Sequence, residues 1–168
     1  RRFAFRVNGA PVQCKGGNWI PSDSLYARIT DAKYERLLLD AAEANFTMLR
    51  IWGGGLYEKD VFYDLCDRLG ILVWQDFMFG CAAYPDYLES FRREVYREMD
   101  YQTLRLGSRA CLAVLCGNNE NHWLIHASRP DLGGLHAYNK MAPTAIRRNC
   151  PHVPWWPSSP YGGAYPND

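Results

Sequence analysis

Short apolar runs alternate with longer amphipathic runs along most of the chain, and this alternation constrains the fold more than any other feature. The segments at residues 12–18, 46–52, 71–77 and 112–117 are short and are interpreted as strands. A helix between two neighbouring strands makes those strands parallel. The sequence therefore predicts an α/β fold in which four βα units build a parallel sheet.

The helices predicted between these strands carry the expected end signals. Thr30 is a favourable N-cap residue, and apolar side chains recur on one face of the segment after it. A second helix is predicted over residues 60–69, and Gly70 suits the left-handed position that follows its end. A third helix, roughly residues 88–106, has acidic residues early and arginines late, which matches the helix dipole.

The chain accounts for about four and a half βα units. A further helix is predicted between residues 132 and 148, and the prolines of residues 153–157 predict an irregular or edge-like strand there. A complete (β/α)8 TIM barrel takes about 250 residues, whereas this chain has 168. We therefore expect residues 1–168 to be the N-terminal part of a TIM-barrel domain, with about its first four to five βα units.

Charge and composition argue against several classes of partner. A net charge of +1 without a long charged run offers no surface for nucleic acid or an anionic membrane. No window approaches the roughly 20 apolar residues of a membrane-spanning helix. The six cysteines form no CxxC pair and are interpreted as buried free thiols. The histidines lack a third ligand at suitable spacing, so neither a metal nor another cofactor is predicted.

Four unusual segments follow the four predicted strands. They are GGNWIPSD at residues 16–23, RIWGGGLYE at 50–58, WQDFMFGC at 74–81 and CGNNE at 116–120. In a parallel barrel, the side chains that act on a substrate project from the C-terminal ends of the strands and from the loops just after them. The four segments therefore predict one functional site at that end of the sheet.

Taken together, these segments resemble the β-mannosidase branch of glycoside hydrolase family 2. The resemblance runs from Phe3 to about Asn167 and includes FYDLCDRLGILVWQDFMF and the late WPSSPYGG. It implies a retaining glycosidase that releases terminal β-D-mannose from β-mannosides, with a glycan as its partner. It also implies that the parent protein contains the remainder of the barrel and flanking β-domains. In a eukaryote, it implies a lysosomal or secreted protein.

The resemblance identifies Glu120, at the end of the CGNNE segment, as the acid/base carboxylate. Retention takes two carboxyl groups about 5 to 5.5 Å apart, one of which attacks the anomeric carbon while the other protonates the leaving oxygen. In this family the second group comes from a seventh strand, in a segment resembling Ser-Glu-Phe-Gly that this chain does not contain. The nucleophile is therefore expected outside the chain, and the isolated chain is expected to be inactive.

Five further residues are expected at the substrate site. Asn119 is expected to hydrogen-bond the sugar hydroxyl beside the reacting carbon, with a turn-stabilising role as the alternative. Arg50 is implied to orient the nucleophile, or else to form a structural ion pair with Asp76 or the acid/base. Asp76 is expected to accept hydrogen bonds from sugar hydroxyls, with a structural salt bridge as the alternative. Trp52 and Trp19 offer flat faces for sugar stacking, although tryptophan also fills cores.

Other functions stay open at this point. The same family contains exo-β-glucosaminidases and endo-β-mannosidases, and a carbohydrate-binding fragment without turnover would keep the same pocket. The glycines at residues 53–55 also suggest a phosphate-binding loop, but the following Lys-Ser/Thr and the GxGxxG spacing are missing. The glycosidase hypothesis is favoured because all four strand-end segments agree with it.

Overall fold

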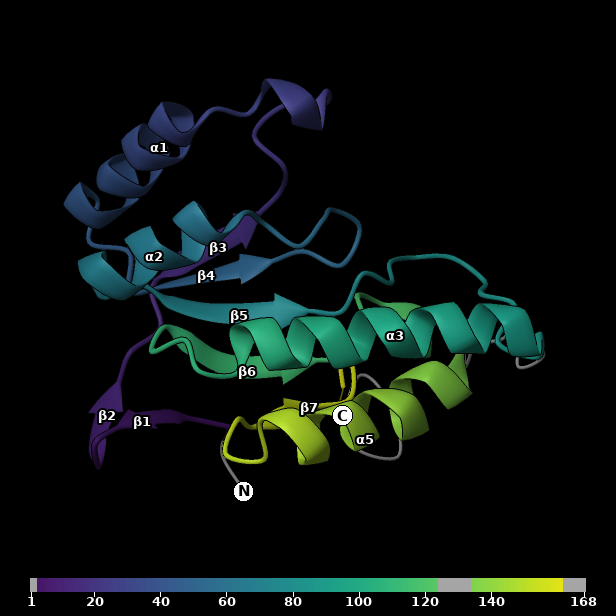
Figure 1. The fold of residues 1–168 in the computed structure, drawn as a ribbon. Helices are drawn as coiled ribbons and strands as arrows, with labels where there is room; N and C mark the ends of the chain where they lie inside the picture. The colour runs from purple at the N-terminus through teal and green to yellow at the C-terminus, as the bar shows by residue number, and fades with distance from the viewer. Residues whose placement is uncertain (1–2, 124–133, 162–168) are drawn as a thin grey trace.

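Five parallel strands form the central sheet of the computed structural model, which describes residues 3–123 and 134–161. The strands are β3 Gly16–Trp19, β4 Met48–Ile51, β5 Leu72–Asp76, β6 Leu112–Cys116 and β7 Trp155–Trp156. They lie side by side in chain order, and each neighbouring pair is parallel (Figure 1). The predicted α/β class and parallel sheet are confirmed.

The helices between the strands agree closely with the end signals in the sequence. The connecting elements are η1 Tyr26–Arg28, α1 Asp31–Glu43, α2 Asp60–Leu69, α3 Glu89–Leu106, the π-helical η2 Ala137–Met141 and α5 Ala142–Asn149. The Thr30 side chain caps α1 by accepting a hydrogen bond from the Lys33 amide. Gly70 ends α2 at φ +71°, in the left-handed conformation that favours glycine. Helix α1 packs against α2, and α3 packs against α5 (Figure 1).

An N-terminal hairpin precedes the first parallel strand, which begins later than predicted. Strands β1 Phe5–Val7 and β2 Ala10–Val12 pair antiparallel, and the parallel strand starts only at Gly16 instead of at residue 12. The turn consists of Asn8 at φ +51° and Gly9 at φ +83°, two left-handed residues that match the twist of a tight hairpin. Figure 1 shows the hairpin near the end of the sheet where the strands begin.

The two faces of the sheet differ in character because side chains alternate along each strand. One face is buried and mostly apolar, with Gln75 as a buried polar member, and its aligned residues belong to or adjoin the main core: Trp19, Ile51, Gln75 and Leu115. The opposite face carries polar and aromatic side chains at the next aligned level: Asn18, Arg50 and Trp74. Every polar residue expected at the site on a strand therefore lies on this second face, close to the C-terminal ends of the strands.

Four of the six cysteines are buried free thiols, as predicted: Cys66, Cys111, Cys116 and Cys150. The prediction is wrong for Cys14 and Cys81, which are free but exposed. Cys14 precedes the edge strand β3, which has a neighbour on one side only, and Cys81 lies in the loop after β5. Neither position has enough surrounding chain to bury a side chain.

Among the helices within the described ranges, none is both long and apolar enough to cross a membrane.

Candidate active site

The segments that follow β5, β6 and β7 hydrogen-bond to one another just beyond the strand ends. Asn119 forms isolated parallel bridges with Gly80 on one side and Ser159 on the other. The amide of Cys81 donates to the Asn119 carbonyl at 3.1 Å, and the amide of Glu120 donates to the Ser159 carbonyl at 2.9 Å. These bonds extend the sheet by one level, so the loops that carry the candidate residues have fixed positions.

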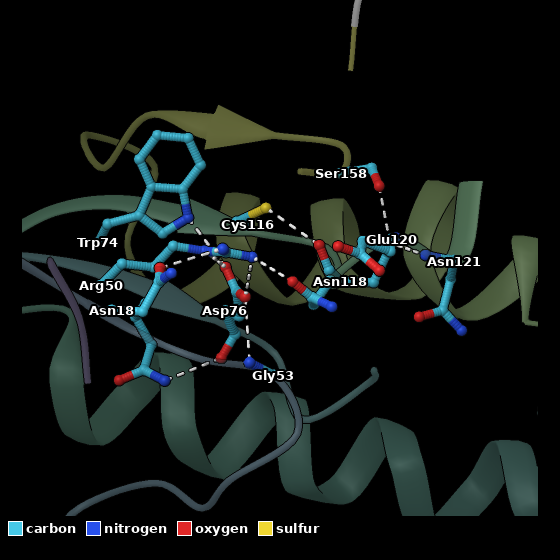
Figure 2. A network of polar contacts seen from close by, with 12 residues as sticks. Asn18, Arg50, Gly53, Trp74, Asp76, Cys116, Asn118, Glu120, Asn121 and Ser158 are labelled. Atoms are coloured by element: carbon cyan, nitrogen blue, oxygen red, sulfur yellow. Dashed lines mark hydrogen bonds and ion pairs between the residues drawn. The ribbon is translucent and has the colours of Figure 1, made fainter. Parts of the chain in front are cut away.

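Asn118 fixes the loop of the CGNNE segment through its side-chain hydrogen bonds. Its side-chain oxygen accepts hydrogen bonds from the Ser158 hydroxyl at 2.7 Å and from the Asn121 amide at 3.0 Å. Its side-chain nitrogen donates to the Pro157 carbonyl at 3.2 Å. Figure 2 shows Asn118, Glu120, Asn121 and Ser158 close together. Sequence analysis gave Asn118 no role, although a buried Asn directly after an apolar strand signals local hydrogen bonding of this kind.

A buried ion pair joins β4 to β5. The Arg50 guanidinium donates from Nη2 to Asp76 Oδ2 at 2.7 Å and from Nε to Oδ1 at 3.2 Å, a bidentate arrangement (Figure 2). Trp74 Nε1 donates to Oδ1 at 2.9 Å, and the Gly53 amide donates to Oδ2 at 3.1 Å. Burial raises the pKa of the Asp76 carboxyl, and Arg50 with the other donors opposes that rise.

This geometry changes the role expected for Asp76. A carboxylate offers about four acceptor positions, and protein donors already fill four of them. The Asp76 side chain is also completely buried. The expectation that Asp76 binds sugar hydroxyls is therefore wrong, and the alternative of a structural ion pair with Arg50 holds.

Arg50 connects all the segments of the site. Besides Asp76, it donates from Nη2 to Asn119 Oδ1 at 2.9 Å and from Nη1 to Asn18 Oδ1 at 3.3 Å. Its side chain keeps 18% of its exposure, whereas that of Asp76 is completely buried. A single cation thus fixes side chains from β3, from the end of β5 and from the loop after β6.

Glu120 and Asn119 contact the same neighbour across the site. Glu120 is half-buried and has φ +63°, a left-handed conformation that is uncommon for a residue other than glycine. The Cys81 thiol donates to Glu120 Oε2 with a sulfur–oxygen distance of 3.3 Å. Asn119 Nδ2 in turn donates to the Cys81 sulfur at 3.1 Å. Sequence analysis missed Cys81 at the site because it was counted with the buried thiols.

The two tryptophans considered as sugar platforms lie in different surroundings. Trp52 is half-buried and lines a shallow cavity of about 290 Å³ together with Pro21 and Tyr26. Trp19 lies instead in the core, where its ring packs against other aromatic rings and its Nε1 donates to Glu58 at 2.8 Å. Its strand position puts it on the face opposite Arg50, so the expectation that Trp19 contacts the substrate is wrong.

A metal centre can be assessed for residues 3–123 and 134–161, which the structure describes. Within these ranges, no group of three or more His, Cys, Asp or Glu side chains is arranged to hold a metal ion. His126 lies outside the described residues, and His152 interacts through Nε2 with the Gly107 carbonyl at 2.9 Å.

Comparison with known proteins places this site in a family. No family model matches the chain. The β-mannosidase of the goat, Capra hircus, is 42% identical over 175 residues, a match that covers 96% of this chain and 20% of that protein. The crystal structure of β-D-mannosidase from Dictyoglomus thermophilum is 47% identical with a TM-score of 0.94, and the match covers 99% of this chain and 21% of that one. An exo-chitosanase from Amycolatopsis orientalis, 18% identical with a TM-score of 0.73 over 92% of this chain and 17% of its own, shares the fold.

The chain spans about one fifth of the length of the β-mannosidases that it matches. The match to the Dictyoglomus structure runs through almost the whole chain, including every segment of the candidate site. The chain therefore belongs to the β-mannosidase branch of glycoside hydrolase family 2.

Proposed function

We propose that this chain forms the first half of the catalytic barrel of a retaining β-mannosidase, with Glu120 as its acid/base. The observation that carries the proposal is the position of Glu120 beside Asn119 at the C-terminal edge of the parallel sheet. Residues that act on a substrate gather at this edge in parallel barrels. The remaining strands of the barrel, and with them the nucleophile, would come from other parts of the complete protein.

The chemistry assigned to Glu120 fits its surroundings. In the first step its carboxyl group would protonate the leaving oxygen while the nucleophile attacks the anomeric carbon. In the second step its carboxylate would take a proton from water, which attacks the glycosyl-enzyme. Glu120 is only half-buried and its carboxyl receives a hydrogen bond from Cys81. Such a group can exchange its proton with a ligand, whereas the buried Asp76 carboxylate has no free acceptor position.

Asn119 has one amide hydrogen available for a sugar. Its Oδ1 accepts from Arg50 and its Nδ2 donates one hydrogen bond to the Cys81 sulfur. An amide nitrogen carries two hydrogens, so the second can be donated to the hydroxyl next to the reacting carbon. An interaction there strengthens as the oxocarbenium character of the transition state develops. The fixed Arg50 contact would orient this donor before the substrate binds.

The Arg50–Asp76 pair would serve the site by pre-organisation. Its bidentate geometry holds the guanidinium in place, and the Arg50 side chain, on the face of the sheet opposite the core, keeps 18% of its exposure. A fixed cation at that place can orient a carboxylate that arrives from a later strand and keep it ionised. This supports the role in orienting the nucleophile, with Asp76 as the group that holds Arg50.

The preference for mannosides rests on the relatives. The goat and Dictyoglomus proteins are both described as β-mannosidases, at 42% and 47% identity. An exo-β-glucosaminidase, an endo-β-mannosidase and a carbohydrate-binding segment without turnover are the alternatives. Assays of the complete protein on aryl β-mannoside, β-glucosaminide and β-galactoside separate the mannosidase from the glucosaminidase and from a segment without turnover. We expect the highest kcat/KM on the mannoside, and a preference for either of the other two sugars would refute the assignment.

The role of Glu120 is tested by Glu120→Gln in the complete protein. For a methyl β-mannoside, whose leaving group needs protonation, we expect kcat/KM to fall by roughly 10²–10⁴-fold, the usual contribution of general acid catalysis. For 2,4-dinitrophenyl β-mannoside, whose leaving group needs no proton, kcat/KM should fall much less. Glu94→Gln, at an exposed position on α3, is the matched control and should retain wild-type rates. An equal loss on both substrates would contradict an acid/base role.

A further inference from the structure

Resting on the function proposed above, we infer that Cys81 is a positioning residue for the acid/base. Its thiol joins Asn119 to Glu120 and holds Glu120 Oε2 as an acceptor, so that the transferable proton resides on Oε1. Neither the fold nor the proposed chemistry requires a thiol at this place. In this way Cys81 controls the orientation of the Glu120 carboxyl group and the oxygen that carries its proton.

The contacts of Cys81 form the last link in a chain of directed hydrogen bonds. Arg50 is fixed by Asp76 and donates to Asn119 Oδ1 at 2.9 Å. The other end of the Asn119 amide donates to the Cys81 sulfur at 3.1 Å, and the thiol donates to Glu120 Oε2 at 3.3 Å. Each group donates to the next, so the buried ion pair sets the direction of the whole chain.

The thiol has the correct protonation state for this role. Burial and the neighbouring Glu120 carboxyl raise the pKa of the Cys81 thiol above its ordinary value. The sulfur therefore keeps its hydrogen near neutral pH and can donate it. Because the thiol donates to Oε2, a proton on the Glu120 carboxyl is favoured on Oε1, the oxygen that Cys81 leaves free for the leaving group. When Glu120 is ionised after proton transfer, the same hydrogen bond remains.

Glu120 depends on this contact for its orientation. Within the ranges that the structure describes, the Cys81 thiol is the side chain that hydrogen-bonds the Glu120 carboxyl. The backbone around the pair is fixed by the bridge between Gly80 and Asn119 and by the Cys81 amide bond to the Asn119 carbonyl. Cys81 and Glu120 both have left-handed backbones, at φ +51° and +63°. Two adjacent loops thus hold uncommon conformations that bring these side chains together.

The experiment compares Cys81→Ala and Cys81→Ser in the complete protein on the two substrates used for Glu120. On methyl β-mannoside, Cys81→Ala should lower kcat/KM about tenfold, a factor that corresponds to ~1.4 kcal/mol and to one hydrogen bond. On 2,4-dinitrophenyl β-mannoside the loss should stay within about twofold, because that leaving group needs no proton. Cys81→Ser restores an O–H donor and should recover the methyl β-mannoside rate to within about threefold of wild type.

Two further variants distinguish the loss of the thiol from a folding defect. Alanine is disfavoured at φ +51°, whereas glycine adopts this conformation readily, so Cys81→Gly removes the thiol without backbone strain. It should reproduce the substrate-dependent loss of Cys81→Ala, and circular dichroism should show both variants folded. Cys14→Ala is the matched control, because Cys14 is also exposed but precedes β3, at the opposite end of the strand from the site. It should behave as wild type on both substrates.

The outcomes separate this inference from the proposed function. Equal losses on both substrates for Cys81→Ala and Cys81→Gly, or no recovery in Cys81→Ser, would show a merely structural role and overturn the inference. Wild-type rates in Cys81→Gly would overturn it as well. In each case a leaving-group effect in Glu120→Gln would leave the proposed function standing. If Glu120→Gln lacks that effect, the proposed function fails and this inference fails with it.

Discussion

Removing either member of the Arg50–Asp76 pair should destabilise the protein sharply, and removing both should cost little more than removing one. Arg50→Met removes the cation beside the completely buried Asp76 carboxylate and leaves it with neutral donors such as Trp74 Nε1 and the Gly53 amide. An uncompensated buried charge of this kind typically costs about 3–5 kcal/mol of unfolding free energy. Asp76→Asn should cost less, about 2–3 kcal/mol, because 18% of the Arg50 side chain still reaches solvent.

The double variant tests whether these costs arise from one interaction. In Arg50→Met/Asp76→Asn no unpaired charge remains, so we expect a total loss roughly 2–3 kcal/mol smaller than the sum of the two single losses. Urea unfolding of the complete protein, followed by tryptophan fluorescence at pH 7, measures all three values. Strictly additive losses would refute the interpretation that Asp76 exists to hold Arg50.

The same variants have a defined pH dependence. Burial raises the pKa of Asp76, and Arg50 opposes that rise, so the pKa should be higher still in Arg50→Met. A carboxyl whose folded pKa exceeds its unfolded value binds its proton more tightly in the folded state. Its penalty is therefore absent below the unfolded pKa of about 3.9 and grows as pH rises toward the folded pKa. The deficit of Arg50→Met should thus be smaller at pH 5 than at pH 7, and a deficit independent of pH would contradict this account.

Two further changes should separate packing from chemistry. Gly53→Ala would place its Cβ 2.4 Å from the Phe79 carbonyl oxygen. It should therefore lower the free energy of unfolding by about 1–3 kcal/mol and also lower kcat/KM. Gly17→Ala has open space around its Cβ, so it should change neither quantity. Thermal unfolding and mannoside assays measure the two quantities. Glu58→Ala should cost about 2–4 kcal/mol in urea unfolding because it leaves two buried aromatic donors unpaired. Glu58→Gln keeps the size of the side chain and one acceptor oxygen, so it should cost less than half as much; equal losses in the two variants would contradict this, because they would show that an amide acceptor cannot replace the carboxylate there.

The helices and most strands followed from local signals in the sequence. The predicted segment 60–69 coincides with α2, because the amphipathic pattern and Gly70 mark its end unambiguously. The first parallel strand was predicted over residues 12–18, whereas β3 covers Gly16–Trp19. The Asn8-Gly9 pair, a strong signal for a tight hairpin turn, was overlooked, although both residues adopt positive φ in the structure. Local turn chemistry therefore outweighed the apolar pattern at this position.

The candidate site was predictable as a set of strand ends but not as a set of partners. Arg50 was expected at the site, but the side chain that accepts from it depends on sheet register, which spacing along the chain does not reveal. Trp19 shows the limit most clearly. It is one residue away from Asn18, and this single step places it on the opposite face of the sheet, against Glu58 and the core. The identity and approximate position of the site residues could be inferred from the sequence, whereas the orientation of their side chains required the structure.

The aligned level of the sheet explains why the ion pair lies where it does. Asn18, Arg50 and Trp74 occupy one level on the face opposite the core, and Asp76 follows two residues after Trp74. Below this level the rings of Phe3 and Phe5 lie within 6.5 Å of Trp74. The Asp76 side chain is completely buried, which strengthens its hydrogen bonds and makes an unpaired charge there costly. The N-terminal hairpin, which was not predicted, therefore places apolar side chains beneath the hydrogen-bonded residues that run from Asp76 toward Glu120.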